Sequence, residues 1–186
     1  ITLGGKQLIE SGAQEGQVID SPALLLASGS LTLDSGRGDS SGATGNLLKI
    51  NDLTRLEADA LVLRSSGLLW LAGGQVNAHS SLLLDGGANN NKAQEGVGLF
   101  IDQGGAPSLG VGATLTANAK ATFLLREQIT ADTLTLHPTA GHISIGDGEQ
   151  AGVIQAVSKV YLQASGQINL LSSADISATA TNGRVS

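Results

Sequence analysis

Apolar and polar residues alternate along short segments of this chain, and small polar corners interrupt the alternation. In the stretch Leu56 to Leu71, LEADALVLRSSGLLWL, apolar side chains recur at every second position on both sides of Ser65-Ser66-Gly67. A period of two is typical of a half-buried strand. The stretch therefore predicts a strand, a corner at Gly67 and a second strand. The inward-facing side chains of this unit are expected to be Leu61, Leu63, Leu69 and Leu71.

The same unit recurs elsewhere in the chain. Val18 to Leu33 and Lys159 to Leu170 align with it without a gap, and Ile129 to Ile145 aligns with one extra residue at the corner. A basic turn of about 19 to 20 residues, lengthened where a polar loop is inserted, accommodates the spacing of the copies and fits the periods of solenoid proteins. Leu48 to Ala58 could also be read at helical spacing, but the threonines of the Ile129 copy favour strands.

The pattern predicts an all-β fold, namely a single β-solenoid over residues 1–186. Each unit presents one row of aliphatic side chains, which can be buried only by stacking on the next unit. Parallel crossovers are almost always right-handed, so we expect a right-handed parallel β-helix of about eight coils. Polar loop insertions are expected near residues 34–46, 85–96 and 146–152. The outward positions are expected to include Thr32, Trp70, Thr135, Tyr161 and Asn169.

Composition narrows the class of protein. The chain has 26 Gly but one Trp, one Tyr and two Phe, which suits a narrow aliphatic interior with repeated tight corners. The net charge is −6 and the basic residues are scattered singly, which disfavours nucleic acid or an anionic membrane as a partner. The absence of Cys excludes disulfides and Cys-ligated metals. No run approaches the roughly 18 apolar residues of a membrane-spanning helix, and no signal peptide is visible at the start.

The two ends of the predicted rod are open strand edges. Neither Ile1 to Glu10 nor Ser172 to Ser186 supplies an amphipathic cap, although uncapped edges promote association. The chain also contains no Met and begins at Ile1. We therefore expect an interior or processed piece of a longer fibre, or one subunit stacked end to end with others.

The repeat resembles those of filamentous haemagglutinin-type exoproteins, which are large bacterial adhesins and contact-dependent toxins exported by two-partner secretion. The shared pattern is an aliphatic residue, Ala, Asp or Ser, then Leu-x-Leu, three small or polar residues and Gly-x-Ile-x-Leu, as in Leu56 to Leu71. It spans most of residues 18–178. The resemblance implies an extended stalk at the bacterial cell surface, secreted through an outer-membrane transporter, with host or neighbouring-cell surface molecules as partners. The Asn-Pro-Asn motifs of the family's secretion domain are missing, which indicates repeat stalk.

Two short motifs fall in the polar loop DSGRGDSSGATG. Arg37, Gly38 and Asp39 match the integrin-binding tripeptide, in the kind of Gly-rich loop from which such a ligand projects. The alternative is a solvated insertion that matches by chance. Gly38 to Gly42 also fits the nucleophile-elbow pattern around Ser40, but no helix start follows it, as that chemistry requires. Trp70 is a candidate contact surface, because the alternation turns the only Trp outward.

Other chemistry is weakly indicated. His137, His142, Asp147 and Glu149 are candidate ligands of a divalent metal. The alternative is that all four are exposed turn residues. Thr-x-Thr pairs, which an ice-binding face would need on successive coils, occur only at Thr114/Thr116 and Thr133/Thr135.

A structural or adhesive stalk segment without catalysis, metal or cofactor is the function that the sequence favours. Self-assembly into an extracellular filament is one alternative. A β-helical polysaccharide-active enzyme is another, and acidic and basic side chains from three or more adjacent coils converging in a groove would indicate it.

Overall fold

The computed structural model describes residues 17–19, 23–35, 47–52, 54–87, 96–171, 173–180 and 182–186. All regular elements in these ranges are β-strands, and none of the described residues belongs to a helix long and apolar enough to cross a bilayer. The strands are β1 (Gln17–Ile19), β2 (Ala23–Leu26), β3 (Ser30–Asp34), β4 (Leu48–Ile50), β5 (Thr54–Arg64), β6 (Leu69–Leu71), β7 (Gln75–Gly86), β8 (Val97–Ile101), β9 (Ser108–Leu109), β10 (Thr114–Ala119), β11 (Thr122–Leu125), β12 (Gln128–Pro138), β13 (Ile143–Ile145), β14 (Val153–Leu162), β15 (Ile168–Leu170), β16 (Asp175–Ala178) and β17 (Arg184–Val185).

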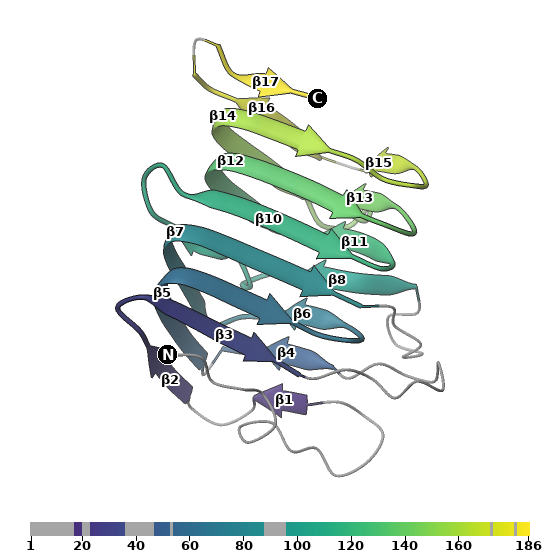
Figure 1. The fold of residues 1–186 in the computed structure, drawn as a ribbon. Helices are drawn as coiled ribbons and strands as arrows, with labels where there is room; N and C mark the ends of the chain where they lie inside the picture. Colours follow the sequence, from purple (N-terminus) through teal and green to yellow (C-terminus); the bar gives the residue numbers. More distant parts are fainter. Residues whose placement is uncertain are drawn as a thin grey trace.

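The strands form two parallel sheets. The seven-stranded sheet has the order β1-β4-β6-β8-β11-β13-β15, and the ten-stranded sheet has the order β16-β14-β12-β10-β7-β5-β2 with β3, β9 and β17 paired beside this path. From β4 onward the chain passes from one sheet to the other and back, so each pass lies directly on the one before it (Figure 1). We call one such pass a coil. The arrangement is consistent with a parallel β-helix.

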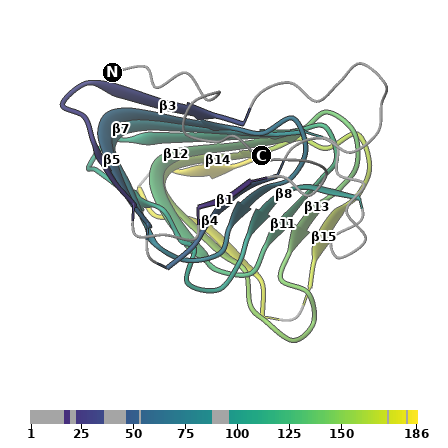
Figure 2. The same cartoon turned by 90° about the horizontal axis from the view of Figure 1, so that it is seen from below.

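The long strands of the ten-stranded sheet bend, which gives the stack three sides (Figure 2). The parallel register shifts between Ala58 and Ala60 where β5 pairs with β7, and between Ala131 and Thr133 where β12 pairs with β14. In the first coil the bend falls in the break between β2 and β3, where the carbonyl of Gly29 accepts from the backbone N–H groups of Asp59 and Ala60. Each long strand therefore contributes an amino-terminal and a carboxy-terminal half to different sides.

Aliphatic side chains fill the interior in vertical columns, because parallel strands in register place equivalent residues on top of one another. Residues of these columns are almost completely buried wherever a coil lies on both sides. The carboxy-terminal halves supply the column Leu31, Leu61, Leu82, Leu115, Leu134 and Val160. The seven-stranded sheet supplies the column Leu48, Leu69, Leu99, Phe123 and Ile143.

Small side chains line the inside of the bend. Ala58 pairs with Ala78, and Ala131 pairs with Ala156, and all four are buried. A longer side chain at this position would meet the opposite wall of a bend that turns within a few residues. Alanine thus lets the two halves of each long strand meet at a sharp angle.

The predicted strand, corner and strand unit is confirmed at Leu56 to Leu71. Leu61, Leu63, Leu69 and Leu71 are all at most 1% exposed, and the segment from Thr54 to Arg64 is a strand and not a helix. The copies at Ile129 and Lys159 also have the predicted register, since Leu134 pairs with Val160 and Ile143 with Ile168.

The predicted register of the copy at Val18 is wrong. The gapless alignment equates Leu31 with Leu69, whereas Leu31 pairs with Leu61 in the structure. The reason is that Gly29 occupies the bend of the ten-stranded sheet, while Gly67 occupies the corner that leads to the seven-stranded sheet. Both corners are short and contain Gly, so the two sides of the coil look alike in sequence.

The expected outward positions Thr32, Thr135 and Tyr161 lie on the outer side of the ten-stranded sheet and are partly exposed. The expected insertion at 146–152 coincides with the connection from β13 to β14. Residues 36–46 and 88–95, which make up most of the other two expected insertions, lie outside the described residues.

Candidate functional site

An aromatic column runs along the outer face of the seven-stranded sheet. Lys49, Trp70 and Phe100 are the central residues of β4, β6 and β8 and pair in register. The Trp70 and Phe100 rings stack with centroids 5.6 Å apart and an interplanar angle of 18°. The Lys49 ammonium lies over the Trp70 ring, 4.2 Å from its centroid. Trp70 is thus covered on one ring face by an aromatic ring and approached by a cation.

Arg126 extends this column to the next coil. Its guanidinium carbon lies 5.0 Å from the centroid of the Phe100 ring, and Phe100 is fully buried although its strand position faces outward. A cation over an aromatic face contributes about 0.5–1 kcal/mol at an exposed site and more when it is desolvated. We call Lys49, Trp70, Phe100 and Arg126 the aromatic column.

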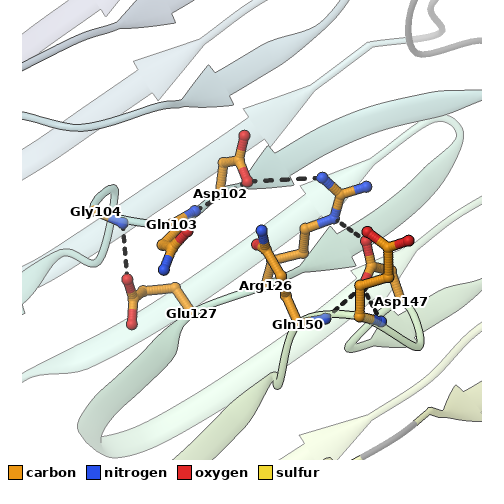
Figure 3. A network of polar contacts seen from close by, with 8 residues as sticks. Asp102, Gln103, Gly104, Arg126, Glu127, Asp147 and Gln150 are labelled. Atoms are coloured by element: carbon orange, nitrogen blue, oxygen red, sulfur yellow. Dashed lines mark hydrogen bonds and ion pairs between the residues drawn. The ribbon is translucent and has the colours of Figure 1, made fainter.

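An ionic cluster adjoins the aromatic column where three adjacent strands end. Asp102 follows β8, Arg126 follows β11 and Asp147 lies just after β13, so the three side chains come from three adjacent coils (Figure 3). Arg126 Nε lies 2.7 Å from Oδ2 of Asp147, in an ion pair whose N–H bond is not aligned with the oxygen. Arg126 Nη1 lies 3.8 Å from Oδ1 of Asp102. All three side chains are about one-quarter exposed or less.

Asp147 is also bound by the backbone of its own turn. Its Oδ1 accepts hydrogen bonds from the backbone N–H groups of Gln150 at 2.8 Å and Glu149 at 2.9 Å. These two bonds, with a smaller contribution from Arg126, hold the pKa of Asp147 below its usual value. Asp147 is therefore an anion at neutral pH, and each of its oxygens has a partner.

Glu127 ties the same corner to a neighbouring loop. Its Oε2 accepts a hydrogen bond from the backbone N–H of Gly104 at 2.8 Å (Figure 3). Its Oε1 accepts one from the backbone N–H of Gln128 at 2.9 Å. The charged groups around Arg126 thus bond to one another and to loop backbone. A general base needs a pKa near the working pH, and the lowered pKa of Asp147 works against that role.

The candidate residues taken from sequence motifs fall in different places. The tripeptide Arg37, Gly38 and Asp39 and the elbow Ser40 lie outside the described residues. Trp70 lies on the outer side of β6 as the alternation predicted, but its ring packs against Phe100. Its indole Nε1 is buried and has no hydrogen-bond acceptor within the described part of the chain.

The four residues named as possible metal ligands do not form one group. Asp147 and Glu149 share the turn after β13, where the Glu149 N–H donates to Asp147. His142 Nδ1 accepts a hydrogen bond from the backbone N–H of Gln167 at 2.8 Å before the start of β13, and His137 lies in β12. No group of three or more His, Cys, Asp or Glu side chains that could hold a metal ion occurs among the described residues.

The two Thr-x-Thr pairs do lie side by side, because Thr114 pairs with Thr133 and Thr116 with Thr135. The array ends there. The coil before them presents Ser81 and Leu83 at these positions, and the coil after them presents Lys159 and Tyr161. Two coils of threonine are too few for an extended hydroxyl lattice.

Sequence reasoning missed Arg126 and Phe100 as members of one cluster. The pattern Leu99-Phe100-Ile101 repeats Leu69-Trp70-Leu71, which would have placed the two aromatic residues in one column once the coils were aligned. No local signal marks Arg126, since its partners Asp102 and Asp147 come from other coils.

No protein-family model, curated protein or solved structure matches this chain. The resemblance to filamentous haemagglutinin-type repeats therefore has its basis in the sequence pattern.

Proposed function

We propose that the chain is a non-catalytic stalk segment of a secreted bacterial cell-surface protein, built as a right-handed parallel β-helix of about eight coils. In this proposal the coils act as a spacer that holds an adhesive or toxic part away from the cell surface. Seven strands, each from a different coil, stack in one sheet of the described structure. The repeat pattern supplies the link to two-partner secretion.

The observation that carries the proposal is that charged side chains of successive coils form ion pairs with one another. Arg126 bridges Asp102 and Asp147 from the coils on either side, and Arg64 lies 3.7 Å from Asp85 on the next coil. Such pairs add to the backbone hydrogen bonds that join one coil to the next. A stalk requires this stiffness along its axis and needs no reactive group.

The location can be tested on the bacterium that produces the chain. We expect an antibody against residues 54–87 to label intact cells, and we expect protease added to intact cells to remove the label. Deleting the gene of the outer-membrane transporter that this proposal requires should retain the chain inside the cell. Labelling that requires cell lysis would refute the proposal.

The alternative is a β-helical polysaccharide-active enzyme, and one observation favours it. Asp102, Arg126 and Asp147 converge from three adjacent coils (Figure 3), which matches the mixed charges expected of such an enzyme but not, by itself, the expected groove. Their mutual pairing weighs against it, because a lyase requires a basic group that is free to take a proton.

The two functions can be separated with purified protein. The chain would be incubated with acidic polysaccharides, with and without Ca²⁺, and unsaturated products would be followed by absorbance. Arg126→Ala and Asp147→Asn would be compared with Arg64→Ala, which lies outside the cluster. Activity that only the first two substitutions abolish would establish the enzyme and refute the stalk.

A further inference from the structure

We draw no further inference here: the strongest candidate, the surface patch on the outer face of the ten-stranded sheet where Lys159 of β14 pairs in register with Arg184 of β17 and both residues are exposed, carries no proposal because nothing in the described part of the chain shows what covers it.

Discussion

Gly87 lies where two coils touch at the corner between the sheets, and a methyl group there should separate them. The backbone N–H of Gly87 donates to the carbonyl of Gly67 at 2.7 Å. A Cβ atom on Gly87 would overlap the carbonyl group of Ser66 and lie 2.8 Å from the nitrogen of Gly67. Because these are backbone atoms, no side-chain rotation can relieve the overlap.

Gly29 provides the same substitution without the overlap. A Cβ atom there meets nothing within 4 Å, and the φ angle at both glycines lies outside the left-handed region. Overpacking costs about 1–3 kcal/mol, and we expect Gly87→Ala to lie at the upper end because backbone must move. Gly29→Ala should instead stabilise the fold by about 0.4–1 kcal/mol, since it restricts the unfolded chain.

Equilibrium unfolding in urea measures both effects, and the only Trp provides the signal. Trp70 lies in the strand that follows the Gly67 corner, so its fluorescence reports on the coils that Gly87 would separate. For a chain of this length a loss of about 3 kcal/mol corresponds to a fall in melting temperature of roughly 6–12 °C. Equal shifts of the urea midpoint for Gly87→Ala and Gly29→Ala would show that the two coils do not approach closely at this corner.

Three further predictions follow from the same packing. Leu63→Ala should lower the free energy of unfolding by about 2–5 kcal/mol, because it leaves a cavity in a fully buried column, and Leu63→Asp should unfold neighbouring coils. Trp70→Ala should lower it by only about 1–2 kcal/mol and leave the circular dichroism spectrum unchanged. The opposite ranking would show a register error. Because the folded pKa of Asp147 is lowered from 3.8, its contribution to stability is present above that pH and is lost as the pH falls below it. Asp147→Asn should therefore flatten the acid limb of a stability–pH curve, and an unchanged limb would contradict this. His142→Ala removes the acceptor of the Gln167 N–H. It should therefore lower the free energy of unfolding by about 1 kcal/mol and speed hydrogen exchange at Gln167. Unaltered exchange at Gln167 would argue against the bond.

The strand unit could be predicted because its information is local. Alternation around Leu61 and Leu69 identifies the buried side of each strand, and Gly67 identifies the corner between them. The side of the coil to which a strand belongs is not encoded locally, so sequence alignment alone predicts the wrong register for the copy at Val18. The decisive fact is the pairing of Leu31 with Leu61, which depends on the neighbouring coil.

The ionic cluster could not be predicted for a related reason. Asp102, Arg126 and Asp147 are separated by intervals that differ because the connections between strands differ in length. A charged residue in one coil therefore gives no indication of which residue lies beside it in the next. The outward position of Trp70 followed from alternation, but its contact with Phe100 required the alignment of the coils.

The pairing order of the strands also affects how such a protein can change over generations. Along the main path of each sheet, a described strand bonds to the strands of the coils directly before and after it. A coil inserted by recombination would therefore meet the same kind of strand edge on both sides, and the loss of a coil would bring two such edges together. Either change adds or removes one interface between neighbouring coils. Lineages could thus alter the length of the rod in whole coils while the remaining coils kept their packing.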